Sequence, residues 1–298
     1  MRYSDARAFR QALEQRLKDA AGGDDARLVN ARRRLLFYRL LARVAATDRD
    51  RWLLKGGLAL DLRLPERARA TRDIDLDWQA PAEELSDAVI DIARHDAGDF
   101  LAFRVERSGA PPESLGGSRR FRVVADLAER PFDSFQLDIG LQRRPFHGRD
   151  WLTTPNVLGF ADVEPPTVAA VPVEIQVAEK LHAYTRAYDG GRPSTRVKDL
   201  VDLVLIAGCL SLDADCLRAA LERTFHARET HAIPGLLPAP PDEWRAPFRE
   251  LAGTVDAPTE MSAAHAEAAA MLSPILGGAV KHGRWHPDRG RWVAGHTG

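Results

Sequence analysis

The sequence predicts an α+β fold, a mixed sheet with flanking helices followed by an all-helical, C-terminal half that makes the chain bilobed. Apolar and polar residues alternate with period two in several short runs between residues 52 and 141, which is typical of strands. From about residue 174 onward the apolar residues recur with helical spacing. A proline-containing stretch at 161–172 separates the two patterns and reads as a linker. The length of 298 residues suits one large domain or two smaller ones, and we expect domains at 1–165 and 166–298.

The N-terminal half contains the elements that matter most for function. Two amphipathic helices are expected first, at about 4–21 and 25–46. A short apolar run then ends in two glycines, which predicts a strand at 52–55, a tight turn and a helix through 59–62. Residues 73–78, Asp-Ile-Asp-Leu-Asp-Trp, alternate acidic and apolar side chains and predict a strand with its acids on one face.

The remaining elements follow from the same two periods. After a helix at 81–95, we expect strands near 100–107, 119–128 and 133–141, with a Gly/Pro/Ser-rich loop at 108–118. The C-terminal half predicts helices at about 174–187, 195–208, 213–227, 241–254 and 259–275. The last 15 or so residues lack periodicity, and we expect them to be loose.

Composition and charge limit the kind of partner and compartment. The formal net charge is −1, so no global positive field favours nucleic acid, and any such contact needs a local basic patch. Cys209 and Cys216 lack the spacing of a metal site, which indicates a reduced environment. The charged N-terminal segment does not resemble a signal peptide and no apolar run is long enough to cross a bilayer, so we expect a cytoplasmic protein.

Three aspartates form a candidate metal site. Asp73 and Asp75 lie two positions apart in the expected strand, so their carboxylates share a face and repel each other unless a cation lies between them. Asp138 is a single acid inside an apolar run, where an unpartnered carboxylate is costly. Carboxylate oxygens suit Mg²⁺, so we predict that the three hold Mg²⁺, with two ions expected. The alternatives are acids that face water and, for Asp138, a buried aspartate that caps a loop.

The turn at Gly56 and Gly57 is a candidate phosphate-binding element. Glycines allow a backbone to approach a phosphate closely, and the N-terminus of the following helix directs its N–H groups at anions. A glycine pair alone is a weak signal. Its order along the chain, followed by a helix, Asp-x-Asp and an aspartate on a later strand, is more specific.

Four segments in this order carry a family resemblance: Lys55-Gly56-Gly57-Leu58-Ala59-Leu60, Arg69-Ala70-Thr71-Arg72-Asp73-Ile74-Asp75-Leu76, residues 173–183 and residues 196–203. The order resembles that of the DNA polymerase beta-like nucleotidyltransferase superfamily. The fuller strings are similar to those of the AbiEii/MenT toxins of bacterial toxin–antitoxin and abortive-infection systems, which show a lysine helix followed by a Lys-Asp-x-x-Asp helix. The resemblance covers about residues 50–210. Gly57 stands where most of the superfamily has serine, and its distance from Asp73 along the chain is at the long end.

The resemblance implies a polymerase-beta-like sheet in the first half and a helical domain that completes the active site. The catalytic residues that it implies are Asp73, Asp75, Asp138, Lys180 and Asp202. The nucleotide-binding residues that it implies are Lys55, Gly56, Gly57, Thr71, Arg72 and Lys180. For Lys180 the alternative is an ordinary surface lysine, and for Asp202 it is a structural salt bridge between two helices.

Thr71 is an expected regulatory phosphorylation site, as the regulation of the resembling family suggests. It lies two positions before Asp73, so a phosphate there would place a charge of roughly −2 beside the metal-binding carboxylates.

The resemblance also implies the reaction. The resembling toxins use nucleoside triphosphates as donors and RNA as the acceptor, so we expect nucleotide transfer to the 3′ end of tRNA, which blocks aminoacylation and translation. A cognate antitoxin is the expected protein partner. Arginine-rich stretches at 31–34, 63–72, 119–122 and 143–149 could supply the basic patch.

Two other classes of function stay open. One is a nucleotidyltransferase with a small-molecule acceptor such as an aminoglycoside, which needs an acidic acceptor cleft and no RNA patch. The other is a non-catalytic interaction protein on the same fold. The sequence does not determine the preferred triphosphate, the tRNA or the oligomeric state.

Overall fold

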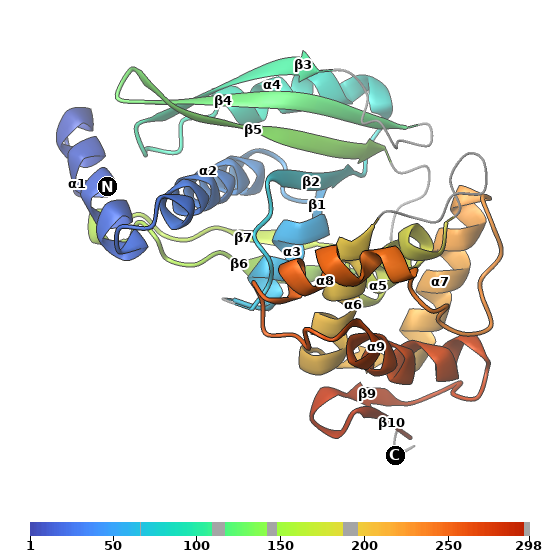
Figure 1. Ribbon diagram of the computed structural model, residues 1–298. Coiled ribbons are helices and arrows are strands. Elements are labelled where there is room, and N and C mark those ends of the chain that lie inside the picture. Colours follow the sequence, from blue (N-terminus) through green and yellow to red (C-terminus); the bar gives the residue numbers. More distant parts are fainter. Residues whose placement is uncertain (66, 109–116, 142–147, 187–195, 295–298) are drawn as a thin grey trace. The chain divides into compact units, whose positions relative to one another are not determined.

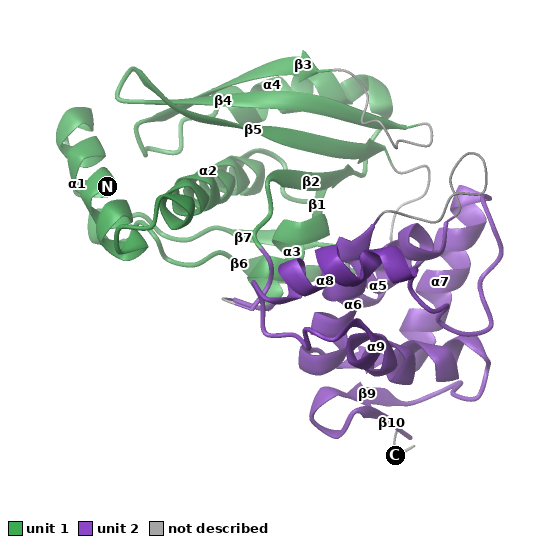
Figure 2. Cartoon of the chain, viewed as in Figure 1, with its two compact units in different colours: residues 1–63, 70–171 green, residues 64–69, 172–298 purple. Residues whose placement is uncertain are grey.

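The computed structural model describes residues 1–65, 67–108, 117–141, 148–186 and 196–294. The chain divides into two compact units, which Figure 2 shows in different colours: residues 1–63 with 70–171, and residues 64–69 with 172–298. The prediction of a mixed α+β fold is confirmed. The expected division into domains at 1–165 and 166–298, and a bilobed form, stay predictions.

The first unit contains a seven-stranded mixed sheet in the strand order β3-β4-β5-β2-β1-β7-β6 (Figure 1). Strand pairing is antiparallel except between β2 and β5 and between β1 and β7. Its strands are β1 (Trp52–Lys55), β2 (Asp73–Trp78), β3 (Leu101–Ser108), β4 (Ser118–Leu127), β5 (Arg130–Leu141), β6 (Asp150–Thr153) and β7 (Thr167–Ala170). Its helices are α1 (Ala6–Ala21), α2 (Asp25–Thr47), α3 (Gly56–Arg63) and α4 (Leu85–Arg94), with short 3-10 turns at Ala82–Glu84 and Gly159–Ala161.

One face of this sheet packs against helices and leaves the acidic side chains on the other. The ring of Phe37 on α2 meets that of Phe135 on β5 edge to face, with ring centroids 5.1 Å apart. Apolar residues of α2 and α4 share one buried core with alternate residues of β2, β4 and β5. Because side chains alternate along a strand, the residues between these apolar positions, including Asp75 and Asp138, lie on the opposite face.

Two short strands lie where the sequence predicted a linker or no element. The stretch at 161–172 contains β7, which runs parallel to β1 with Leu54 opposite Ala170, and the N–H of Val171 donates to the carbonyl of Leu54 at 2.9 Å. β6 pairs with β7 and forms an edge of the sheet. The linker interpretation is therefore wrong for β7. Four residues are too few to establish a period, so this strand is defined by its pairing.

The second unit is mainly helical. Its helices are α5 (Val173–Thr185), α6 (Val197–Cys209), α7 (Ala214–Arg228), α8 (Arg245–Ala252) and α9 (Met261–Leu276). Helix α5 packs against α6 and α7, and α6 packs against α8 and α9. A three-stranded sheet completes the unit in the order β10-β9-β8, with β8 at Leu212–Asp213, β9 at Arg284–His286 and β10 at Arg291–Val293. Short 3-10 turns lie at Asp242–Trp244 and Pro287–Arg289.

This small sheet corrects two predictions, namely an all-helical second half and a loose C-terminal segment. The hairpin of β9 and β10 is anchored by two tryptophans. Trp285 is 2% exposed and donates from its indole N–H to the carbonyl of Ala207 at 2.8 Å. Trp292 donates to the carbonyl of Met271 at 2.8 Å. One buried and one half-buried indole, both with satisfied N–H groups, order a segment that has no internal periodicity.

No helix in the described part of the chain has the length and apolar character required to cross a membrane.

A buried ion cluster joins α2 to the start of β3. Asp99 is fully buried and accepts from both guanidinium ends of Arg43, at 2.8 and 2.9 Å, and from Arg39 at 2.6 Å. Burial raises the pKa of the Asp99 carboxyl, but hydrogen bonds and charge from Arg43 and Arg39 outweigh it and leave that pKa below its usual value. The ion cluster therefore stabilises the folded state fully at pH values above the ordinary aspartate pKa. This stabilisation is lost as the pH falls through the lowered, folded-state pKa of Asp99.

We predict that Asp99→Asn lowers the free energy of unfolding by about 3–5 kcal/mol, because it leaves two buried guanidinium groups without their counter-charge. Urea unfolding at pH 7 measures this change. Asp91→Asn is the matched control, since Asp91 is exposed on α4, and its change should stay within about 0.5 kcal/mol. Equal unfolding free energies for the two variants would contradict the prediction.

Candidate functional site

The register of β2 and β5 brings two of the predicted metal ligands together. In this parallel pair Asp75 lies opposite Asp138, and Asp73 lies opposite Gln136 on the same face. All three acids are half-buried, on the face of the sheet away from α2. The prediction that the Asp-x-Asp segment forms a strand with its acids on one face is therefore confirmed.

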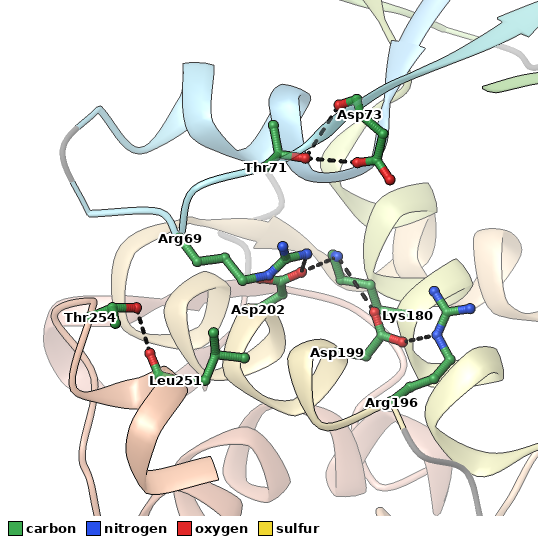
Figure 3. Close-up of polar contacts among 9 residues, drawn as sticks. All are labelled: Arg69, Thr71, Asp73, Lys180, Arg196, Asp199, Asp202, Leu251 and Thr254. Carbon is green, nitrogen blue, oxygen red and sulfur yellow. Dashed lines mark hydrogen bonds and ion pairs between the residues drawn. The ribbon is translucent and has the colours of Figure 1, made fainter. Parts of the chain in front are cut away.

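Thr71 contacts the first acid of the strand. Figure 3 shows its hydroxyl turned toward Asp73, donating to the carboxylate Oδ1 at 2.9 Å and lying 3.3 Å from the carbonyl oxygen of the same residue. Thr71 is 8% exposed. The hydroxyl thus orients the Asp73 carboxylate, and any change at this side chain acts directly on Asp73.

Arg120 on β4 holds the third acid. Arg120 lies opposite Asp138 in the antiparallel β4–β5 pair. Its Nε donates to Oδ1 at 2.7 Å and its Nη2 donates to Oδ2 at 2.6 Å, so both carboxylate oxygens are engaged. The hydrogen bond to Asp138 is the largest of the effects that raise the pKa of the Arg120 guanidinium, and the charges of Asp73 and Asp75 add to it.

The glycine turn abuts the second acid. Gly56 begins α3 with φ +67°, a conformation that side chains with a Cβ rarely adopt. A Cβ at this position would overlap the carboxylate of Asp75. Glycine is therefore required twice, for the backbone conformation and for the close approach to Asp75. Gly57 is buried in the first turn of α3.

Lys55 and Asp77 form an ion pair above Gly140. The ammonium of Lys55 lies 2.5 Å from Oδ1 of Asp77, which is fully buried, and Asp77 lies opposite Gly140 in the register of β2 and β5. A Cβ on Gly140 would overlap the Asp77 carboxylate and lie 2.9 Å from the Lys55 ammonium. Asp77 is thus a partner of Lys55 and does not face solvent.

The three aspartates are chemically suitable ligands for a divalent cation, because carboxylates on one sheet face offer the oxygen atoms that Mg²⁺ prefers. Over the ranges that the structure describes, no three acidic, histidine or cysteine side chains converge as a preformed metal cluster. Protein groups already engage acids of this face: Asp138 is held by Arg120 and Asp73 by Thr71. Coordination of a metal by Asp138 would therefore require that carboxylate to share or change its partner.

A second cluster of predicted residues lies within the second unit. Asp202 on α6 is fully buried and accepts from both Nε and Nη2 of Arg69 at 3.0 Å, and from the Lys180 ammonium on α5 at 2.5 Å (Figure 3). Asp199, one turn earlier, lies 3.8 Å from Lys180 and accepts from Arg196 at 2.7 Å. The salt bridge between helices that the sequence left open is present, and Lys180 is buried, which excludes an ordinary surface lysine.

Asp202 stays ionised in this cluster. Burial raises the pKa of its carboxyl, but the charges of Lys180 and Arg69 and their hydrogen bonds outweigh it, so that pKa lies below the usual value. A buried carboxylate with two cationic partners orients those partners firmly. Asp202 therefore anchors the Lys180 ammonium on one side.

Arginines proposed as an RNA patch are partly engaged elsewhere. Arg32 contacts Glu14, and Arg34 lies 2.8 Å from Asp61, which is 5% exposed. These two side chains therefore hold α2 to α1 and α3. Of the stretch 143–149, residues 143–147 lie outside the described part of the chain.

Sequence reasoning counted Arg69 and Arg120 only among the arginine-rich stretches of a possible RNA patch, and it assigned no role to Gly140. Arg69 lies within the matched segment, but its bond to Asp202 links positions 133 residues apart. Arg120 and Gly140 acquire their contacts through strand register. The signal that could have identified Arg120 is its place in a strand next to the one that carries Asp138.

The mixed sheet, the glycine turn at the start of α3 and the carboxylates on β2 and β5 are the features on which the sequence resemblance to nucleotidyltransferases rests. The model of the family described as nucleotidyl transferase AbiEii toxin, type IV toxin–antitoxin system, matches residues 39–275. The chain belongs to this family of nucleotidyltransferase toxins. A search of curated proteins finds no match.

Two solved structures are similar to this chain. MenT4, the nucleotidyltransferase toxin Rv2826c from Mycobacterium tuberculosis H37Rv, is 18% identical with a TM-score of 0.61, over 88% of this chain and 89% of that one. JHP933 from Helicobacter pylori is 14% identical with a TM-score of 0.47, over 84% of this chain and 94% of that one. The similarity to MenT4 shows a shared fold and nothing beyond it.

We predict that Gly140→Ala disrupts the Lys55–Asp77 pair and lowers the free energy of unfolding by about 1–3 kcal/mol, because the added methyl group overlaps a buried carboxylate. Thermal and urea unfolding measure the change. Gly208→Ala in α6 is the control, since nothing lies within 4 Å of its Cβ position, and it should be neutral or stabilising by up to about 1 kcal/mol. A stable Gly140→Ala protein would show that the pair can move aside.

Proposed function

We propose that this protein transfers a nucleoside monophosphate from a nucleoside triphosphate to the 3′ acceptor end of tRNA, with Mg²⁺ held by Asp73, Asp75 and Asp138. The observation that carries the proposal is the parallel register of β2 and β5, which sets Asp75 beside Asp138 and puts Asp73 on the same face. Membership of a nucleotidyltransferase toxin family supplies the reaction class, the triphosphate donor and the implied antitoxin partner.

The chemistry follows from the groups on this face. The acceptor hydroxyl attacks the α-phosphorus of the triphosphate, the bond from that phosphorus to the bridging oxygen breaks, and pyrophosphate leaves. Bound Mg²⁺ would neutralise the triphosphate and lower the pKa of the attacking hydroxyl. Asp138 is the candidate base for the hydroxyl proton, and Asp73 and Asp75 are the candidate ligands that position the donor.

The phosphates need cations and backbone donors. Gly56 and Gly57 at the start of α3 provide a close backbone approach, and Arg72 is exposed directly before Asp73. We assign Lys55 to this phosphate-binding set beside its contact with Asp77. Lys180 is proposed to stabilise the charge that develops on the phosphates, with its ammonium oriented by Asp202, which also accepts from Arg69.

RNA as the acceptor fits the toxin family, since a nucleotide added to a tRNA acceptor end blocks aminoacylation and stops translation. The exposed arginines on β4 are the better candidates for phosphate contacts. Arg122 is exposed and donates to the neutral hydroxyl of Ser134, whereas Arg32 and Arg34 hold acids. Phosphate contacts of this kind weaken as salt rises.

We predict that the wild type, with Mg²⁺, transfers label from at least one of the four α-labelled triphosphates to total tRNA. Asp73→Asn should reduce transfer by at least about a hundredfold, because the site loses a charged ligand. Gel analysis of labelled tRNA measures transfer. Asp126→Asn, a charge change farther along β4, is the control and should retain activity. Label on an aminoglycoside and none on RNA would support a small-molecule acceptor instead.

We also propose that phosphorylation of Thr71 switches the enzyme off. The Thr71 hydroxyl already contacts the Asp73 carboxylate at 2.9 Å, so a phosphate on it would set two negative groups against each other and remove the hydrogen bond. Because Thr71 is 8% exposed, the side chain must turn outward to be modified.

We predict that Thr71→Glu loses at least about tenfold in transfer rate at saturating triphosphate, because a carboxylate beside Asp73 displaces or repels it. Thr71→Val is the control: it removes the hydrogen bond without adding charge and should keep most of the activity. Initial rates of label transfer distinguish the two variants. Equal losses in both would show that the hydrogen bond, and not negative charge, is what matters at this position.

A further inference from the structure

The partner of Asp138 in this structure is a cation supplied by the protein itself. Arg120 and Asp138 face each other across β4 and β5, and two parallel N–H···O bonds of 2.7 and 2.6 Å join them. The Arg120 side chain is 27% exposed and that of Asp138 is 15% exposed, so the pair is partly shielded from water. A pair of this geometry is among the strongest that an arginine makes.

This pair differs from an ordinary cross-strand salt bridge. Asp138 lies opposite Asp75 in the pairing of β5 with β2, and Asp73 lies on the same face, so the Arg120 guanidinium is bonded to one of three acids that share a face. Arg122, two residues along the same strand and on the same face, instead donates to the hydroxyl of Ser134 at 3.3 Å. Arg120 therefore engages an acid of this face, whereas Arg122 hydrogen-bonds to a neutral hydroxyl.

We infer that Arg120 is a built-in counter-ion of the acidic face, which holds Asp138 while no divalent cation is bound and competes with that cation for the Asp138 carboxylate. The inference rests on the proposed function, because it requires Asp73, Asp75 and Asp138 to form the metal site. Arg120 acts through Asp138 and is thus a positioning residue.

Two consequences follow with opposite signs. A guanidinium beside the metal site repels a divalent cation and occupies both Asp138 oxygens, so Arg120 weakens metal binding. The same contact keeps Asp138 in one orientation when no metal is present and offsets the repulsion among three carboxylates. Removing Arg120 should therefore strengthen metal binding, lower the stability of the metal-free protein and slow transfer. A purely structural salt bridge would not strengthen metal binding when removed.

The test measures the binding of Mn²⁺ alone, which serves as a probe for Mg²⁺. Electron paramagnetic resonance at low ionic strength gives the concentration of free Mn²⁺. We expect Arg120→Gln to bind Mn²⁺ about tenfold more tightly than the wild type, and the difference to shrink as salt screens the charges. Arg122→Gln removes the same charge from the same strand and face, and its affinity should stay within about twofold of the wild type. In an Asp138→Asn background, Arg120→Gln should have a smaller effect, because only the charge repulsion remains to be removed.

Folding is checked by circular dichroism in the presence of a chelator. We expect Arg120→Gln to melt at a lower temperature than the wild type without metal and to gain more from saturating Mn²⁺. If Arg120→Gln does not fold without metal, Arg120→Lys keeps the charge with a single contact, and it should bind Mn²⁺ more tightly than the wild type because it releases one Asp138 oxygen; an affinity no higher than that of the wild type would overturn the inference.

The outcomes separate the two proposals. Suppose that Arg120→Gln binds Mn²⁺ no more tightly than the wild type, while Asp73→Asn abolishes binding. This result overturns the role of Arg120 and leaves the metal site intact. Wild-type binding that Asp73→Asn does not change overturns the metal site and the inference with it. Tighter binding in Arg122→Gln as well would show a general charge effect and would overturn the specific role of Arg120.

Discussion

The pairing of β2 with β5 places carboxylates side by side, and the arrangement of the residues around them depends on offsetting their repulsion. The parallel pairing of β2 with β5 sets Asp75 beside Asp138, with Asp73 on the same face. Carboxylates this close repel one another unless cations or hydrogen-bond donors offset the repulsion. The surrounding residues meet that requirement: Thr71 donates to Asp73, Arg120 to Asp138, and Gly56 admits the Asp75 carboxylate where a Cβ would collide with it. The same charge density suits the face to a divalent cation.

In the second unit as well, basic side chains offset the negative charge of an aspartate, and here the aspartate is fully buried. Asp202 is fully buried, and this burial by itself raises the pKa of its carboxyl. Two cations from different segments, Lys180 on α5 and Arg69 before β2, keep it charged and are themselves held in place. Burying these ions costs desolvation free energy, and removing one partner would leave buried charge less well compensated. The three side chains are therefore held in one arrangement. A fixed ammonium is what the proposed role of Lys180 at the phosphates would require.

Much of the fold was predictable because its elements are long and strongly periodic. The strand with acids at 73, 75 and 77, the helix after the glycine turn and most helices of the second unit follow from local pattern. The strands that were missed, β6 to β10, have two to four residues, so their sequences carry no period. They form because a neighbouring strand offers hydrogen bonds, and the C-terminal hairpin is ordered because Trp285 and Trp292 are held by carbonyl groups of α6 and α9.

The sequence by itself determined the family, the order of the motifs and the kinds of groups in the site, because glycine turns and Asp-x-Asp strands have local signatures. It also placed Asp73 and Asp75 on one face, since strand geometry requires it. Only the tertiary structure decided the partners: Arg120 for Asp138, Asp77 for Lys55, and Arg69 for Asp202. Each of these contacts joins residues far apart in the chain through strand register or helix packing. Partner choice is therefore a property of the folded chain, which local sequence patterns do not encode.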